Sequence, residues 1–441
     1  MAAGLGASVG QARVTHTRWN FTVFGADITF FSLGLSISSV YTVIPLFVHH
    51  LTSNNEAVAL IPAVRAAGLY VPTLLVASLV ERQRHALPFI LRVTILERVP
   101  YLLLALGALW LAGGNPGLLL LFLILMMFLA TFGSGLTYPA WLDMIARTIP
   151  GNWIGRFFGF WTGLGGFFGI GGAAVAAALL GHFAFPLNFA LCFLLTFGMF
   201  VISFVLLALG REPPRTMRRE LVTLDAAERE YGGGAGLRVE LRATWALLRG
   251  DRGLLRLIGS NALMGIATMA SALFAVAALR RGGLTDADVG VENTVLVVAM
   301  TGGYFLWGIL GDRFGHRTIL VFGSLCAALS AGVALWAHGF WAYALVFLLL
   351  GFNLAATSLA GFTFITEFGP AARRPTYIAL AAVAYAPFAV GAPILGGFLA
   401  DAWGYVPVFI ISAVAGLAAM LAFQLLVPDP RSRAAQAEKQ P

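Results

Sequence analysis

The chain has 441 residues, of which 59% are hydrophobic and 11% are charged, and its formal net charge is +8. Soluble domains average about 45–50% apolar and about 25% charged residues, so this composition excludes an ordinary soluble enzyme. A membrane-spanning helix needs about 20 apolar residues, and twelve such helices would use about 57% of a chain of this length. The sequence therefore predicts an all-α integral membrane protein whose function lies mostly within the bilayer.

The apolar residues fall into six runs on each side of a polar stretch. The first six runs lie at about residues 20–47, 57–79, 87–112, 117–141, 157–181 and 187–210, and the second six at about 254–279, 290–310, 318–337, 340–366, 377–400 and 406–427. We interpret them as twelve transmembrane helices in two six-helix bundles, at 20–210 and 254–427. The remaining segments are an N-terminal tail at 1–19, a central loop at 211–253 and a C-terminal tail at 428–441.

The central loop is dense in charge. Its tail, RVELRATWALLRGDRGLLRL, has the pattern of a basic amphipathic helix lying on the membrane surface, although a solvated linker fits equally well. The two cysteines, Cys192 and Cys326, lie in apolar runs and indicate neither a disulfide framework nor a thiolate metal site.

The basic residues predict the orientation of the chain. If both termini are cytoplasmic, all 28 Lys and Arg residues except four lie in cytoplasmic tails, loops and span edges; the exceptions are Arg65, Arg98, Arg280 and Arg281. The positive-inside rule therefore predicts an inner (plasma) membrane protein with both termini in the cytoplasm. The basic balance is then a topology signal, and no nucleic-acid partner is expected.

The two halves of the chain repeat a pattern of charges. Glu81 and Arg84 follow the second run, as Asp312 and Arg317 follow the eighth. Asp143 ends the fourth run, as Glu367 ends the tenth. Equivalent charges in two six-span units predict a duplicated, pseudo-symmetric architecture in which the halves move about a site between them.

Residues 308–320, GILGDRFGHRTIL, resemble the loop signature of the major facilitator superfamily, G-x-L-x-D-R-x-G-R-R in outline. The first copy, SLVERQRH at 78–85, keeps an acid and bases but lacks the glycines. The resemblance implies the major facilitator fold and a cytoplasmic gate that closes in the outward-open state. Its expected members are Asp312, Arg313, Gly315, Arg317 and Glu367 in one half and Glu81, Arg84 and Asp143 in the other. The alternative is that these are ordinary interfacial charges.

Five ionisable residues need an explanation at or near membrane depth, where an unpaired charge costs several kcal/mol. Asp27, Glu97 and Arg98 fall at similar depths in the first and third spans. They predict either a proton-coupling carboxylate or a static buried ion pair. Asp27 could pair with Arg98 and leave Glu97 to titrate, or Glu97 and Arg98 could engage separate partners. Arg65 is expected to extend toward the outer surface, and Glu292 to stay hydrated at the outer mouth of its span.

The resemblance also implies that spans 1, 4, 7 and 10 line a central cavity. Side chains in these spans are mostly neutral, and we expect lining residues among Phe31, Ser39, Thr137, Tyr138, Asn261, Met264, Asn353 and Thr357, although helix packing explains such stripes as well. Few fixed charges favour a neutral or amphipathic solute. Span 5 is rich in glycine, which lets helices approach closely.

These patterns favour a secondary transporter of a small organic solute that works by alternating access, with proton-coupled efflux as one form. No P-loop pattern is present, so we expect no ATP hydrolysis, no enzymatic activity, no catalytic residues and no cofactor. The lone His49-His50 pair predicts no metal site. The expected partners are a small-molecule substrate, the lipid bilayer and protons, with the monomer as the working unit. The alternatives are a multi-span membrane enzyme acting on a lipid-linked substrate and a non-transporting sensor.

Overall fold

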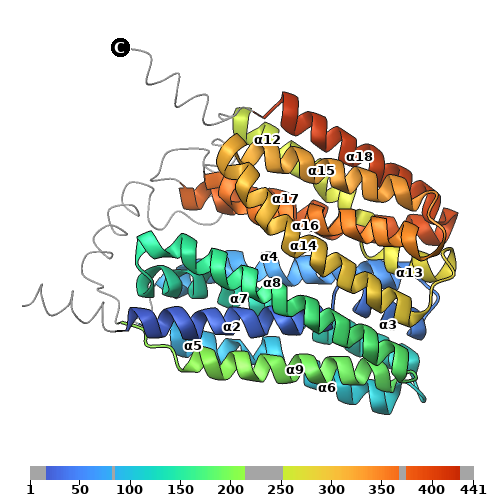
Figure 1. The fold of residues 1–441 in the computed structure, drawn as a ribbon, viewed down its shortest axis with the longest axis horizontal. Coiled ribbons are helices and arrows are strands. Elements are labelled where there is room, and N and C mark those ends of the chain that lie inside the picture. Colours follow the sequence, from blue (N-terminus) through green and yellow to red (C-terminus); the bar gives the residue numbers. More distant parts are fainter. Residues whose placement is uncertain (1–15, 82–84, 214–251, 367–373, 428–441) are drawn as a thin grey trace, which may run out of the picture.

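The computed structural model describes residues 16–81, 85–213, 252–366 and 374–427, and these are folded almost entirely into helices (Figure 1). The first half contains α2 (Thr17–Ile37), α3 (Val43–Leu51), α4 (Asn55–Glu81), α5 (Leu87–Val93), α6 (Ile95–Leu111), α7 (Pro116–Thr148), α8 (Gly151–His182) and α9 (Leu187–Ala208). The second half contains α12 (Arg252–Ala267), the short 3-10 turn η1 (Thr268–Ala270), α13 (Leu273–Arg280), α14 (Asp286–Phe314), α15 (His316–Ala334), α16 (Gly339–Thr366), α17 (Arg374–Trp403) and α18 (Tyr405–Leu425).

Ten helical segments of the described chain are long and apolar enough to cross a membrane. The multi-span, all-helical prediction is therefore confirmed, whereas the count of twelve spans stays a prediction. The predicted third span is divided at Thr94 into α5 and α6, which have 7 and 17 residues.

The predicted first span is also broken, between α2 and α3. Ser38 ends α2 with φ −108° and ψ 61°, outside the helical region. Its hydroxyl lies 2.7 Å from that of Thr196 on α9. The Tyr41 backbone N–H donates to the Ser39 hydroxyl, and local side-chain bonds of this kind compete with regular helix geometry, so this run need not continue as one helix.

Helix packing links elements within each half and then joins the halves. In the first half α2 packs against α8 and α9, and α7 packs against α4 and α6. In the second half α15 packs against α16 and α18, while α14 packs against α16. Two helix pairs, α4 with α17 and α8 with α14, connect the halves, as the ribbon shows for α8 and α14 (Figure 1).

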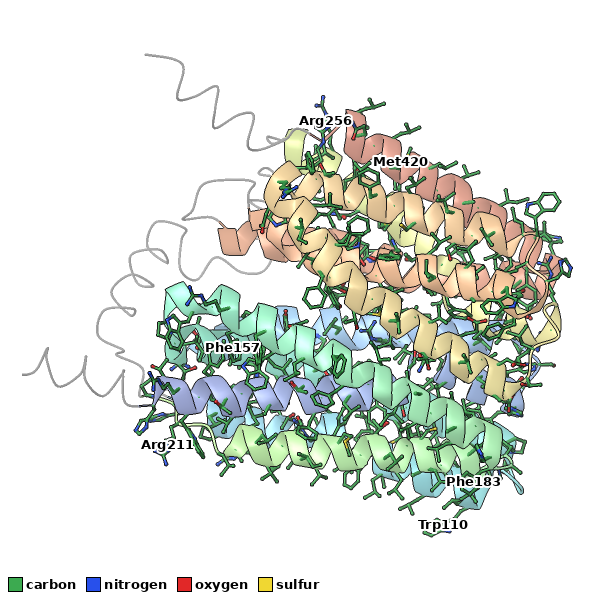
Figure 2. All side chains as sticks on the ribbon, viewed as in Figure 1. Trp110, Phe157, Phe183, Arg211, Arg256 and Met420 are labelled. Carbon is green, nitrogen blue, oxygen red and sulfur yellow. The ribbon has the colours of Figure 1, made fainter. Side chains whose placement is uncertain are left out.

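The two ends of the molecule carry different side chains (Figure 2). One end, where α2 begins and α9 ends, carries Arg211 and Arg256, and we name it the predicted cytoplasmic end. The other end, where α8 ends and α4 begins, is the predicted outer end. Four tryptophans near this end, Trp110, Trp336, Trp341 and Trp403, are 76%, 81%, 83% and 68% exposed. Exposed tryptophans at the ends of spans are typical of the membrane–water interface.

Candidate functional site

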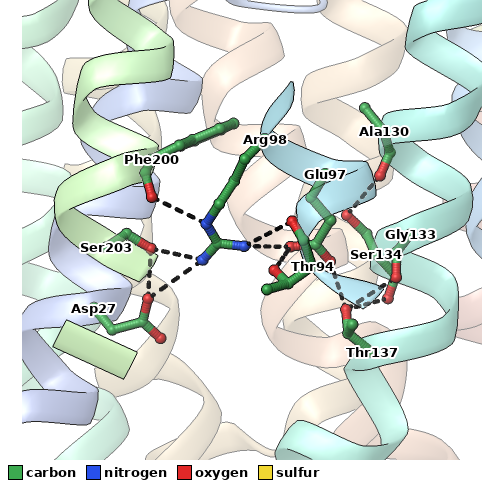
Figure 3. Close-up of polar contacts among 10 residues, drawn as sticks. All are labelled: Asp27, Thr94, Glu97, Arg98, Ala130, Gly133, Ser134, Thr137, Phe200 and Ser203. Carbon is green, nitrogen blue, oxygen red and sulfur yellow. Dashed lines mark hydrogen bonds and ion pairs between the residues drawn. The ribbon is translucent and has the colours of Figure 1, made fainter. Parts of the chain in front are cut away.

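The three ionisable residues predicted at membrane depth in the first half lie together (Figure 3). Arg98 on α6 is 5% exposed and lies between Glu97, 7% exposed, and Asp27 of α2, 6% exposed. An Nη1–Oε2 distance of 3.2 Å joins Arg98 to Glu97, and an Nη2–Oδ1 distance of 3.9 Å joins it to Asp27. Arg98 therefore contacts both acids, which resolves the two pairings left open by the sequence.

Neutral groups complete this charge cluster. Arg98 donates from Nε to the Phe200 carbonyl at 3.0 Å and from Nη2 to Ser203 Oγ at 3.0 Å. Ser203 in turn donates to Asp27. Glu97 accepts from Thr94 at 2.7 Å and also from Thr137 on α7. The cluster thus joins α2, α6, α7 and α9, and burial of these charges is tolerated because each one has partners.

A second network lies at the predicted cytoplasmic end, within the first half. Arg147 on α7 contacts Asp143, one turn earlier, at 2.9 Å and Glu212 at 2.6 Å. Glu212 also accepts the backbone N–H groups of Ala86 and Leu87 at 2.9 and 2.8 Å, which caps the start of α5. Arg147 was not expected as the partner of Asp143, and its second acid, Glu212, belongs to the predicted central loop.

The predicted gate residues of the second half occupy the turn between α14 and α15. Gly315 makes this turn with φ 87°, a conformation that favours glycine. Asp312 and Arg313 are exposed, and Arg317 donates to the Val427 carbonyl at 3.3 Å. Of the other predicted gate residues, Arg84, Glu367 and the side chain of Glu81 lie outside the described part of the structure.

Polar contacts join the two halves at the predicted outer end. The Asn55 side-chain amide donates to Asp401 of α17 at 2.7 Å, and its carbonyl oxygen accepts from Tyr405 at 2.7 Å and from Arg280 at 3.2 Å. Arg280 also donates to the Ser53 carbonyl at 2.8 Å. These groups tie the start of α4 to α13, α17 and α18.

A parallel set of contacts connects α2 and α3 with α14. His50 and Asp286 are 2.7 Å apart. The buried Asn293 accepts from Thr42 at 2.8 Å and donates to the Ser36 carbonyl at 2.9 Å. The predicted outer end is therefore closed by hydrogen bonds contributed by both halves.

The glycines of α8 show how far this closure extends along the molecule. A Cβ placed on Gly181 would lie 3.2 Å from Ala287 Cβ of α14, and one on Gly166 would lie 2.6 Å from Thr301 Oγ1. At Gly163 the nearest atom, in Phe305, would be 3.2 Å away. One and two turns further, Gly159 and Gly155 would meet nothing within 4 Å. Helix α8 thus contacts α14 closely from the outer end to Gly163, and then faces open space.

The predicted cavity residues of the first half differ in their surroundings. Phe31 stacks on Phe200 with ring centroids 4.7 Å apart, and Ser39 accepts the Tyr41 backbone N–H at 3.3 Å. Thr137 belongs to the charge cluster described above. Tyr138 is 40% exposed.

In the second half, Met264 and Asn353 are buried against each other, with a distance of 3.9 Å from Asn353 Nδ2 to the Met264 sulfur. Thr357 donates to the Asn353 carbonyl at 3.1 Å, and Asn261 is partly exposed.

Arg65 donates to the Tyr41 hydroxyl at 3.2 Å and interacts electrostatically with Tyr70 and Tyr101, and its extension toward the outer surface stays a prediction. The expectation for Glu292 is wrong. Glu292 does not stay hydrated at a mouth of the molecule: it is 0% exposed, and both carboxylate oxygens lack a hydrogen-bond partner in the described structure. Hydropathy gave the depth of these residues but not the helix face on which they lie.

The Major Facilitator Superfamily model matches residues 271–441. NiaP of Bacillus subtilis (strain 168), provisionally assigned as a niacin/nicotinamide transporter, is 22% identical over 167 residues, which are 38% of this chain and 42% of NiaP. The chain thus matches less than half the length of this relative.

Two solved structures share the fold over most of their length. A variant of the nucleoside transporter NupG has a TM-score of 0.69 at 11% identity, covering 93% of this chain and 100% of that one. The D-xylose-proton symporter has a TM-score of 0.68 at 15% identity, covering 93% and 98% of the two chains. The predicted resemblance to the major facilitator superfamily is therefore confirmed. The chain thus shares the fold of these solved transporters, and its residues 271–441 match the Major Facilitator Superfamily model.

Proposed function

We propose that this chain is a secondary transporter that moves a small organic solute by alternating access. The observation that carries the proposal is the uneven contact between the halves. Hydrogen bonds from both halves close the predicted outer end, whereas the glycine stripe of α8 leaves α14 toward the predicted cytoplasmic end. This is the geometry expected of a conformation open to the cytoplasm. The alternative of a lipid-acting membrane enzyme has no comparable observation in its favour.

The outward-open conformation would need new contacts between the halves at the predicted cytoplasmic end. We assign these to the predicted gate, in which Asp312, Arg313 and Arg317 would approach Asp143 and its neighbours when the outer end opens. The exposure of Asp312 and Arg313 in the present conformation supports this assignment, because exposed side chains can be reached by the other half when the cytoplasmic end closes.

Proton coupling belongs to the same proposal and rests on the Asp27–Arg98–Glu97 cluster. A rearrangement that separates one acid from Arg98 would leave a buried carboxylate that takes up a proton. The protein would work as a monomer in the inner membrane, with both termini in the cytoplasm. It would move its solute out of the cell.

Transport by purified protein in proteoliposomes tests this function. Niacin and nicotinamide, the solutes in the name of NiaP, are the first probes. We expect flux without ATP that responds to an imposed pH gradient, and loss of this response in Asp27→Asn or Glu97→Gln protein that still elutes as a folded monomer. Flux that requires ATP would contradict the secondary mechanism. A pH response unchanged in both variants would remove the coupling role.

A further inference from the structure

Arg65 has surroundings unlike those of any group in the charge cluster. It lies in the middle of α4, where it donates to the Tyr41 hydroxyl at 3.2 Å. Much of its surface is exposed. Because Arg65 also interacts with tyrosines of the other half, its exposed surface faces the space between the halves.

The hydrogen-bonding capacity of Arg65 is largely unused. A guanidinium carries five N–H donors. Arg98 uses its donors on two carbonyls, a hydroxyl and Glu97, whereas Arg65 has the Tyr41 hydroxyl as its side-chain acceptor. Among the ion pairs of the described residues, none involves Arg65. A membrane-depth cation without a protein counter-ion favours an anion in the space beside it.

Tyrosines from both halves surround this guanidinium. The guanidinium carbon Cζ of Arg65 lies 5.9 Å from the centroid of the Tyr41 ring. Tyr70, also on α4, and Tyr385 on α17 meet edge to face with centroids 5.9 Å apart. Tyr385 and Tyr304 on α14 interact electrostatically with Arg65 across the boundary between the halves. The position thus combines one positive charge with aromatic rings from α4, α14, α17 and the turn between α2 and α3, at the place where the halves meet.

We infer that Arg65 and the surrounding tyrosines form the binding site for a small aromatic monocarboxylate, with the carboxylate on Arg65 and the ring among Tyr41, Tyr70 and Tyr385. One guanidinium matches one carboxylate, and a dianion would leave a charge uncompensated. The rings suit a planar solute by offset or edge contact. The inference rests on the proposed transport function and replaces the neutral solute expected from the sequence.

Equilibrium binding to purified protein in detergent tests this site separately from transport. Benzoate and benzamide form a matched pair of nearly equal shape in which only the first is charged, and phthalate adds a second charge. We expect benzoate to bind better than benzamide and phthalate. Arg65→Gln should weaken benzoate binding by about tenfold or more, the effect of losing one charge-assisted hydrogen-bonded pair. Arg65→Lys should keep part of the preference for the acid.

Arg256→Gln is the matched control, because this arginine lies at the exposed cytoplasmic end and should leave binding unchanged. The unfolding temperature of each variant establishes that it is folded. Equal affinity for benzoate and benzamide, no binding of benzoate, or unchanged affinity in folded Arg65→Gln would each overturn the site. None of these results would contradict alternating access, which depends on flux and on the contacts at the outer end.

Discussion

Two glutamates of this molecule are almost equally buried but have opposite surroundings. Glu97 is 7% exposed and accepts hydrogen bonds from Arg98, Thr94 and Thr137. Glu292 is 0% exposed and has no hydrogen-bond partner for either oxygen in the described structure. Burial of a carboxylate stabilises a fold only where its charge and lone pairs are compensated.

The same substitution at both positions should therefore have different effects. Glu97→Gln should lower the free energy of unfolding by about 1–3 kcal/mol, because it removes charged hydrogen bonds that Arg98 needs. Glu292→Gln should change it by less than about 0.5 kcal/mol or increase it, because a buried carboxyl group without partners is replaced by a neutral amide of similar shape. Thermal unfolding of the two proteins in one detergent compares them. An equal loss at both positions would contradict this account.

At the scale of the helix, the approach of α8 to α14 depends on glycine. A side chain at Gly166 would meet Thr301, whereas one at Gly171 on the same helix would meet nothing within 4 Å. Gly166→Val should separate the helices and destabilise the protein by about 1–3 kcal/mol, the usual effect of overpacking, with a matching loss of flux. Gly171→Val carries the same loss of helix propensity and serves as the control. Equal stability and flux in the two variants would show that close packing at Gly166 is unimportant.

The end of α3 gives the closed outer end a dependence on pH. His49 Nδ1 accepts a hydrogen bond from Arg280 at 3.2 Å. Burial, followed by the charges of Arg280 and His50, lowers the pKa of His49 below its ordinary 6.5, although Asp286 opposes the shift. The folded state therefore binds a proton on His49 more weakly than the unfolded state does. The contribution of neutral His49 to the free energy of unfolding is complete above about pH 6.5 and is lost as the pH falls through the lowered pKa.

Acidification should therefore reduce the unfolding temperature more in the natural protein than in His49→Gln, which has no titrating ring at this position. The comparison requires unfolding curves for both proteins between about pH 7.5 and about pH 5, a range that spans the ordinary histidine pKa. Parallel decline of the two curves would exclude a contribution from His49.

For the whole molecule, apolar runs were sufficient to predict the helices and the multi-span architecture, because each run must satisfy its backbone internally. The break at Ser38 was not predictable in this way, since a continuous apolar run does not show where a helix is interrupted. The depths of Asp27 and Arg98 indicated their proximity. Hydropathy does not predict which helices pack together. The contributions of Ser203 and Thr137 to the charge cluster, and the contact of Arg65 with Tyr41, were therefore not predictable.

Alternating access predicts that the outer end must open during transport, and a covalent link there tests this directly. In a chain lacking Cys192 and Cys326, Gly181→Cys with Ala287→Cys joins α8 to α14, and Gly165→Cys with Ser32→Cys joins α8 to α2 within one half. Both glycines would place a Cβ 3.2 Å from the partner Cβ, close to the roughly 3.5–4.5 Å typical of disulfides.

The decisive measurement is solute flux in proteoliposomes containing each cysteine pair, before and after oxidation and after reduction. We predict that oxidation of the pair that joins α8 to α14 stops flux and that a reductant restores it, while the pair within the first half transports at the same rate throughout. Undiminished flux through protein that is fully cross-linked between α8 and α14 would contradict alternating access in this molecule.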